Sequence, residues 1–231
     1  MEKDPHFKKT LSGYAKMNTN YFLIKAKNKK HFSDYRKKDS FYESSIYGGY
    51  EMCLCIPEEH EDEIVWDLCG GPGHLSYALK NVIILDKNKK FSPIVTELYK
   101  SEKEKTRKFE ICDLSKIKDF KQISENFVKV KYFICNPPFG DKGTPIIRNI
   151  FCNLLQNQHL FLMLPTYCIP QFELFYNKNY LHKPISKEES WGFELVQIAK
   201  GLDLKYDPIN RAVYHPFEKL NHQGAIFYFS K

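Results

Sequence analysis

A short apolar run that stops at two consecutive prolines constrains this chain more than any other feature. The run Tyr132–Cys135 combines aromatic and β-branched residues over the length of a buried strand. Asn136, Pro137, Pro138 and Phe139 follow it directly. A proline fixes φ at about −65°, has no N–H to give to a sheet, and pushes the preceding residue into an extended conformation. The sequence therefore predicts a rigid elbow at a strand end, which holds one amide and one aromatic ring in a fixed relation.

A glycine-rich turn lies upstream of this elbow. Residues 63–69 have the pattern of a buried strand and lead directly into Gly70–Gly73. We expect a helix to begin near His74 and to include Leu75 and Leu79. A strand, a glycine turn and a helix in this order let a ligand approach the backbone closely at a helix N-terminus. The pattern predicts a ligand site at the end of this strand.

Acidic residues end the next two predicted strands. The apolar runs 82–86 and 109–113 finish at Asp86 and Asp113. Asp86 comes nineteen residues after Asp67, and an acid about 20 residues on is placed to bind ribose hydroxyls. Folds of the α/β class bind ligands at the carboxyl ends of their strands. Four successive strands therefore each bring a polar or glycine group to one edge, where we expect the functional site.

The remaining residues supply the other elements of an α/β fold. Residues 47–50 form a turn-prone stretch, after which apolar residues alternate with Cys53 and Cys55 up to residue 56. Thr144 is a candidate N-cap for a helix that has Pro145 in its first turn. The later apolar patterns predict, in order, a helix over 146–155, a strand over 159–164 and an antiparallel pair of strands over 193–199 and 225–229.

The positive charge of the chain is concentrated near its N-terminus. The net charge is +7; residues 1–40 contain eleven lysine and arginine residues against four acidic ones, and the remainder is neutral. Aromatic residues interleaved with cations fit phosphate contacts and base stacking, and they also fit a solvated basic tail. We therefore divide the chain into a basic arm or small helical extension over 1–45 and one α/β domain over 46–231.

Cysteine usage and hydropathy argue against several classes of protein. The seven cysteines are odd in number and include no C-x-x-C pair, so we expect reduced core thiols and no zinc or other metal. No apolar run approaches the roughly 20 residues of a membrane span, and the N-terminus lacks the apolar core of a signal peptide. We expect an intracellular protein of the cytoplasm or nucleus with no membrane segment.

The elbow suits one chemical problem. The exocyclic amine of adenine is a poor nucleophile, because its lone pair is delocalised into the ring. The amide oxygen of Asn136 and the carbonyl oxygen of Pro137 can each accept one N6–H, which favours a pyramidal nitrogen. This help is positional and electrostatic and does not require a strong base. Phe139 offers a face on which the base can stack, a contact worth roughly 1–3 kcal/mol.

These motifs together resemble those of the S-adenosylmethionine-dependent adenine-N6 methyltransferases, whose fourth motif is Asn/Asp-Pro-Pro-Tyr/Phe. The turn after Asp67 resembles their first motif, Asp/Glu-x-Gly-x-Gly-x-Gly, with Cys69 in place of the first glycine. The resemblance implies a Rossmann-like class I methyltransferase fold of the α/β class, with a seven-stranded, mostly parallel sheet and an antiparallel last strand. It also implies that catalysis depends on Asn136, Pro137, Pro138 and Phe139.

The resemblance further implies that S-adenosyl-L-methionine is the cofactor. In relatives the acid that ends the third strand, here Asp113, contacts the adenine amine of the cofactor. A segment just upstream of the glycine motif helps to hold its methionine end, and Tyr47 is our candidate there. The implied cofactor-binding set is Asp67, Cys69, Gly71, Gly73, Asp86, Asp113 and Tyr47.

Several alternatives stay open. The chain has no room for a separate target-recognition domain, so DNA and RNA are both candidate substrates, with recognition by the arm, by the loops over 171–222, or by a partner subunit. Protein glutamine-N5 methyltransferases use the same elbow on an amide nitrogen, typically with tyrosine, but the basic arm favours nucleic acid. A catalytically inactive methyltransferase-fold subunit of a complex is a further alternative, against which the intact Asp67, Asp86, Asp113 and Asn136 argue.

Overall fold

The computed structural model describes residues 44, 46–100, 105–178, 184, 186–207, 212–213 and 224–231 of the 231-residue chain. The predicted basic arm therefore lies outside the described residues except for Ser44, as do most of the loops between residues 208 and 223.

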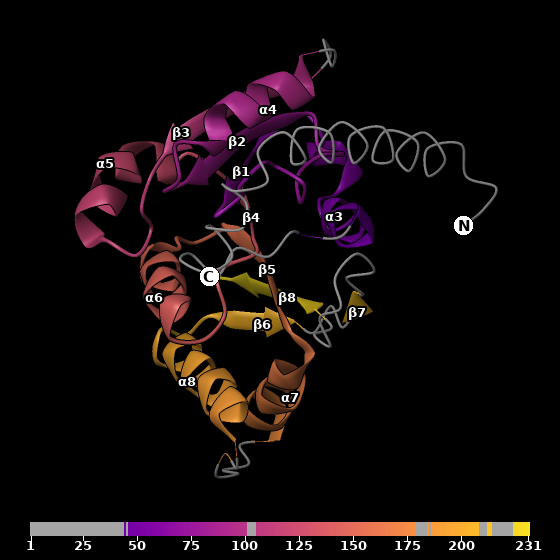
Figure 1. Cartoon of the computed structure of the whole chain (residues 1–231). Coiled ribbons are helices and arrows are strands. Elements are labelled where there is room, and N and C mark those ends of the chain that lie inside the picture. The colour runs from indigo at the N-terminus through magenta and orange to yellow at the C-terminus, as the bar shows by residue number, and fades with distance from the viewer. Residues whose placement is uncertain are drawn as a thin grey trace, which may run out of the picture.

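A mostly parallel sheet forms the centre of the molecule (Figure 1). Its strand order is β3-β2-β1-β4-β5-β8-β6, and the two-residue β7 (Ala212–Val213) pairs with β8. β8 runs antiparallel to both of its main neighbours, β5 and β6. This arrangement confirms the predicted mostly parallel sheet with an antiparallel last strand. The seven main strands are β1 (Ile64–Leu68), β2 (Asn81–Asp86), β3 (Thr106–Ile111), β4 (Tyr132–Cys135), β5 (His159–Pro165), β6 (Lys205–Asp207) and β8 (Gly224–Ser230).

Helices pack on both faces of this sheet. One face is covered by α5 (Ile117–Phe127), α6 (Thr144–Asn153), α7 (Ile169–Lys178) and α8 (Lys187–Gly201). The other is covered by α3 (Ile46–Cys53) and α4 (Phe91–Tyr99). Figure 1 shows α4 beside the β1–β3 half of the sheet and α7 and α8 beside the β6 and β8 half. Single 3-10 turns complete the described elements: η1 (Glu58–His60), η2 (Gly140–Lys142) and η3 (Thr166–Cys168).

The strand that leads to the elbow is buried on both faces. Phe133 and Cys135 of β4 belong to the core under the α5–α8 helices, whereas Tyr132 and Ile134 belong to the core under α3 and α4. Phe127 of α5 stacks on Phe133 with ring centroids 4.3 Å apart. Burial of side chains of this size stabilises a fold by roughly 1.5–3 kcal/mol each. The end of β4 is therefore held firmly in place.

The helix expected after the glycine turn is absent, so that prediction was wrong. Residues 71–79 form successive turns, in which the Leu79 amide bonds to the carbonyl of Ser76 three residues back. Arg107 of β3 donates to the carbonyl groups of Ser76, Tyr77, Leu79 and Lys80, and Lys105 also donates to that of Tyr77. The short stretch 69–80 between β1 and β2 is therefore stabilised without a helix.

The segment 193–199, which we predicted to be a strand, is part of helix α8. The side chain of Ser186 caps this helix by accepting a hydrogen bond of 3.1 Å from the amide of Glu189. The buried side chains recur at helical spacing along it: Trp191, Leu195, Val196 and Ala199. The late strand pair of the sheet is formed instead by β6 and β8.

Two further local predictions need correction. Residues 46–53 form helix α3, with Met52 fully buried and Leu54 half-exposed, where we expected a flexible turn and an alternating segment. The buried Met52 anchors this helix to the core beneath it. Thr144 is the first residue of α6, and Gly143 holds the capping position, so the N-cap prediction was wrong by one residue.

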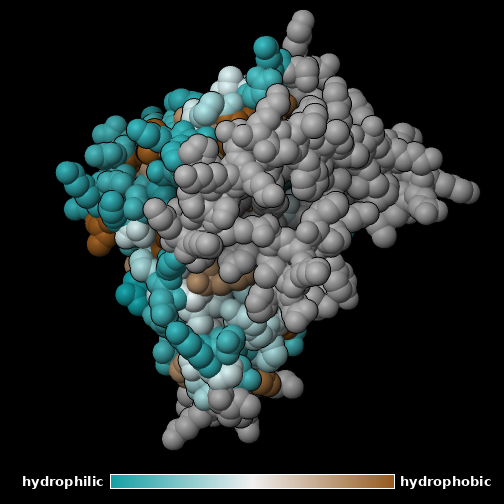
Figure 2. All heavy atoms as spheres, in the orientation of Figure 1, coloured by the Kyte–Doolittle hydropathy of each residue, from teal (hydrophilic) through white to brown (hydrophobic). Residues whose placement is uncertain are grey.

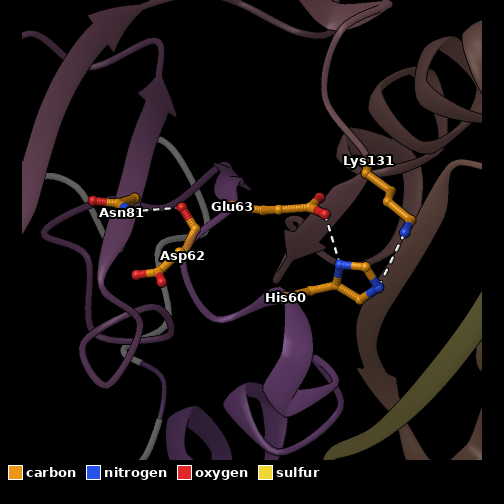
Figure 3. Close-up of polar contacts among 5 residues, drawn as sticks. All are labelled: His60, Asp62, Glu63, Asn81 and Lys131. Carbon is orange, nitrogen blue, oxygen red and sulfur yellow. Dashed lines mark hydrogen bonds and ion pairs between the residues drawn. The ribbon is translucent and has the colours of Figure 1, made fainter.

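Polar contacts tie together the amino ends of the strands, away from the predicted site (Figure 3). His60 lies between Glu63, which is 2.6 Å from Nδ1, and Lys131, whose Nζ is 3.1 Å from Nε2. Because a lysine ammonium can only donate, Nε2 accepts and the ring proton lies on Nδ1. Asn81 donates to the carbonyl of Asp62. These contacts fix the starts of β1, β2 and β4.

The described surface in the view of Figure 2 is largely hydrophilic. No helix of the described residues is long and apolar enough to cross a membrane.

Candidate active site

The register of the sheet brings the predicted site residues to one edge. Leu68 at the end of β1 pairs with Leu85 of β2 and with Cys135 of β4. The glycine turn, Asp86 and Asn136 therefore emerge side by side at the carboxyl ends of their strands. Asp113 follows two residues after the end of β3, next to β2.

The glycine turn adopts a backbone conformation that favours glycine. Cys69, Gly71 and Gly73 have φ values of 61°, 53° and 82°. Non-glycine residues seldom adopt such values, and those that do cluster at functional sites. Glycine at position 70 is required by space, since a Cβ there would lie 2.6 Å from the carboxyl carbon of Asp67. Cys69 is half-buried, whereas Gly71 and Gly73 are buried.

Asp86 supports this turn from the end of β2. Its Oδ2 accepts a 3.1 Å hydrogen bond from the amide of Gly71, and its Oδ1 accepts one of 2.8 Å from the amide of Asn88. The carboxylate therefore orients the glycine turn, a role that the sequence did not predict. The predicted contact with a ribose stays a prediction, and carboxylate oxygens can accept more than one hydrogen bond each.

Asp67 is a fully buried carboxyl group beneath the same turn. Ser76 donates a 2.6 Å hydrogen bond to its Oδ2, whereas no described residue donates to Oδ1. Burial raises the pKa of Asp67 to about 7, with nearby Asp86 adding to the shift and Ser76 and Arg107 opposing it. An unsatisfied buried oxygen is rare in proteins, and it marks a position for a donor that the described residues do not supply.

Asp113 remains an ionised hydrogen-bond acceptor. Burial alone would raise its pKa, but hydrogen bonds from Ser115 and the Lys116 cation outweigh that effect and lower it. Its Oδ1 accepts from the Ser115 hydroxyl at 2.6 Å, and Lys116 lies 3.3 Å from Oδ2. Its position beside Asp86 is compatible with the predicted contact to an adenine amine, which stays a prediction.

The elbow follows β4 as predicted, with Pro137 buried and Pro138 and Phe139 half-buried. The Nδ2 group of Asn136 donates a 3.0 Å hydrogen bond to the hydroxyl oxygen of Ser44. No described residue donates a hydrogen bond to the amide oxygen of Asn136, Oδ1. The arrangement leaves an acceptor for an incoming N–H group.

Two residues whose role the sequence did not predict, Trp191 and Gly143, pack against the elbow. The Phe139 ring lies 6.1 Å from that of Trp191 in α8, at a tilt of 48°. Trp191 is itself fixed by a 2.9 Å hydrogen bond from its indole N–H to the hydroxyl of Thr144. Gly143 packs directly against the carbonyl group of Pro138. These contacts bring Phe139 together with α6 and α8, and its predicted role in base stacking stays a prediction.

Some predicted features lie outside what is described. Tyr47 belongs to α3, but the position of its side chain is not among the described ones. The basic arm over 1–40 is likewise outside them. Among the described residues, no group of three or more His, Cys, Asp or Glu side chains could hold a metal ion.

No family model matches the sequence, and no curated protein matches it. Solved structures do match the fold. The glycopeptide N-methyltransferase MtfA, solved with (S)-adenosyl-L-methionine, is 9% identical with a TM-score of 0.51, over 83% of this chain and 96% of MtfA. Trm5b from Pyrococcus abyssi is 15% identical with a TM-score of 0.51, over 82% of this chain and 51% of Trm5b. A putative RNA methyltransferase from Pyrococcus horikoshii is 19% identical with a TM-score of 0.49, over 79% of this chain and 81% of its own.

At these identities the likeness shows the fold alone. With the strand order and the antiparallel β8, it establishes a Rossmann-like fold of the class I methyltransferase type.

Proposed function

We propose that this chain transfers a methyl group from S-adenosyl-L-methionine to the N6 amine of adenine in nucleic acid. One observation carries the proposal: the Asn136 amide stands at the end of β4 beside the glycine turn, with its N–H group bound to Ser44 and its oxygen left for a donor. The target amine of adenine is such a donor. In α/β folds of this kind, ligands bind at the carboxyl ends of the strands, which is the edge of the sheet where Asn136 lies.

The residues at the ends of β1, β2 and β3 fit the proposed cofactor. S-Adenosyl-L-methionine carries an ammonium group, two ribose hydroxyls and an adenine amine, all of which donate hydrogen bonds. Against these donors the edge offers the carboxylates of Asp86 and Asp113 as acceptors, whereas Asp67 is fully buried beneath the glycine turn. The turn around Gly71 lets a ligand approach the backbone closely. When bound, the cofactor supplies an electrophilic methyl group on a positively charged sulfur.

The elbow then acts on the target nitrogen. Asn136 Oδ1 and the Pro137 carbonyl each accept one N6–H, which keeps the nitrogen lone pair aimed at the methyl carbon. With the cofactor bound, the N–C bond would form as the S–C bond of the cofactor breaks, and the nitrogen would release one proton to solvent. Phe139 stacks on the base, which is flipped from a duplex or comes from a single strand. No strong base is needed, because the developing positive charge acidifies the amine.

The test is methyl transfer from labelled cofactor to DNA, RNA and protein, followed by nucleoside and amino-acid analysis. We expect N6-methyladenine, formed without added metal. Asn136→Ala should abolish transfer while leaving cofactor affinity in calorimetry nearly unchanged, and Asn136→Asp should retain part of the activity because an acid still accepts the N6 hydrogen bond. Asn153→Ala, at the exposed far end of α6, is the matched control and should behave like the wild type.

Other products would refute the assignment in different ways. A modified cytosine or a ribose ether would show that the role given to Asn136 is wrong. Methylated glutamine would show that the elbow acts on an amide nitrogen of a protein and not on adenine. Cofactor binding without transfer to any polymer would favour a non-catalytic subunit.

A further inference from the structure

We propose that Ser44 is a positioning residue for Asn136, which makes the segment just before α3 part of the active centre. The inference rests on the proposed function, since Asn136 must be the residue that acts on the target nitrogen. Asn136 Nδ2 donates a hydrogen bond of 3.0 Å to Ser44 Oγ, across 92 positions of sequence. Both side chains are half-buried, so water competes only in part for this hydrogen bond.

The contact restrains the rotation of the Asn136 amide group. Its terminal torsion is broad, so a free amide samples many planes. Only an amide whose plane contains the N6–H direction accepts that hydrogen well. With Nδ2 held by the Ser44 oxygen, the plane is fixed and Oδ1 points away from Ser44. The hydrogen bond therefore reduces the conformational entropy that the Asn136 side chain loses when the base binds.

Helix α3 begins two residues after Ser44. Met52 anchors α3 through its fully buried side chain. Cys53 Sγ donates to the carbonyl of Leu75, at 3.7 Å, in the turns that follow the glycine motif. α3 therefore contacts the glycine-turn side of the site, and the Ser44 hydroxyl contacts the elbow at the end of β4.

A hydroxyl can accept or donate, which gives the contact a second property. In Asn136→Asp the Ser44 O–H can turn and donate to the carboxylate. The side chain at position 136 would keep its plane, consistent with the partial activity expected of that variant. A side chain that could only donate, or only accept, could not both accept from Asn136 and donate to the carboxylate of the Asn136→Asp variant.

The experiment compares Ser44→Thr with Ser44→Val in the full chain. The two variants have nearly the same shape and differ by the hydroxyl. Loss of one neutral hydrogen bond corresponds to about a two- to tenfold effect. We expect Ser44→Val to lower kcat for adenine methylation by that factor, with KM and cofactor affinity unchanged. Ser44→Thr should keep the wild-type kcat. Equal kcat in wild type and Ser44→Val would overturn the proposal.

A second measurement does not depend on catalysis. The side-chain NH2 resonances of Asn136 in a ¹⁵N–¹H spectrum are identified by their disappearance in Asn136→Asp. In Ser44→Val they should move toward the values of exposed asparagines, and in Ser44→Thr they should stay. Unmoved resonances in Ser44→Val would also overturn the proposal. A wild-type enzyme that makes no N6-methyladenine would instead contradict the proposed function, whatever the spectra show.

Discussion

Gly143→Ala is the sharpest test of how the elbow is held. Gly143 has φ −83° and ψ −33°, a conformation open to any residue, so backbone strain does not require glycine here. Space does. A Cβ at this position would lie 1.8 Å from the carbonyl oxygen of Pro138 and 3.0 Å from its carbonyl carbon. Real Cβ atoms essentially never approach another atom closer than 3.0 Å, so one of the two backbone segments must move by more than about 1 Å.

The expected loss follows from this displacement. Gly143 is tied to η2 by its amide, which bonds to the carbonyl of Gly140 at 2.8 Å, and to α6 by its carbonyl, which accepts from Ile147 at 2.9 Å. We therefore expect the Pro138 side of the elbow, rather than Gly143, to move. A misplacement of about 1 Å in a catalytic arrangement can lower a rate about 100-fold. Overpacking of this kind also destabilises a fold by roughly 1–3 kcal/mol.

Single-turnover methyl transfer to an adenine-containing oligonucleotide is the suitable assay. Gly143→Ala should lose about 100-fold in rate, while cofactor affinity stays close to wild type because the glycine turn at the end of β1 is untouched. Gly201→Ala is the matched control, since no atom lies within 4 Å of a Cβ there and its φ is not positive. A cooperative thermal unfolding transition would verify the fold. Wild-type turnover in Gly143→Ala would refute the view that contact with Gly143 sets the position of the elbow.

Three other predictions concern single side chains. Asp86→Ala should weaken cofactor binding more than about tenfold in calorimetry, because it removes the proposed acceptors for the ribose hydroxyls and releases the amide of Gly71; unchanged affinity would contradict this. Phe139→Ala should raise KM more than it lowers kcat, whereas Phe139→Trp should retain activity; equal behaviour of the two variants would rule out stacking. The pKa of Asp67 rises from 3.8 to about 7 on folding, so the folded state binds its proton more tightly and stability should fall as pH rises from about 4 to 7, by on the order of a few kcal/mol. Asp67→Asn should lose this pH dependence in denaturant titrations, and a dependence that persists would assign it to another group.

The strands and their ends could be predicted from sequence because their signals are local. Each of the runs that end at Asp86 and Asn136 is short, apolar and followed by a polar or proline residue. β4 is buried along its whole length, as its composition indicates. The order of these runs, with glycines after the first, was enough to indicate the sheet and its ligand-binding edge.

The helix errors have identifiable physical causes. The apolar run 193–199 fits a strand or a helix by composition, and the deciding signal is the Ser186–Glu189 capping pair several residues earlier. The missing helix after the glycine turn could not be predicted locally. The turns found there are stabilised instead by Arg107 and Lys105, which bind their carbonyl groups and lie about thirty residues away in sequence.

The two halves of the candidate site differ in the same way. The glycine-turn half has positive φ at Cys69, Gly71 and Gly73 and a carboxyl group below them, and Asp86 supports it from the end of the next strand. Most residues of this half therefore belong to recognisable sequence motifs. The elbow half depends on Ser44, which is distant in sequence, and on Gly143, whose requirement is a contact and not a conformation. Neither residue belongs to a motif, yet both act on the position of the elbow. Substitutions at these two positions should therefore change turnover and spare cofactor affinity, which is the opposite of what substitutions in the glycine turn should do.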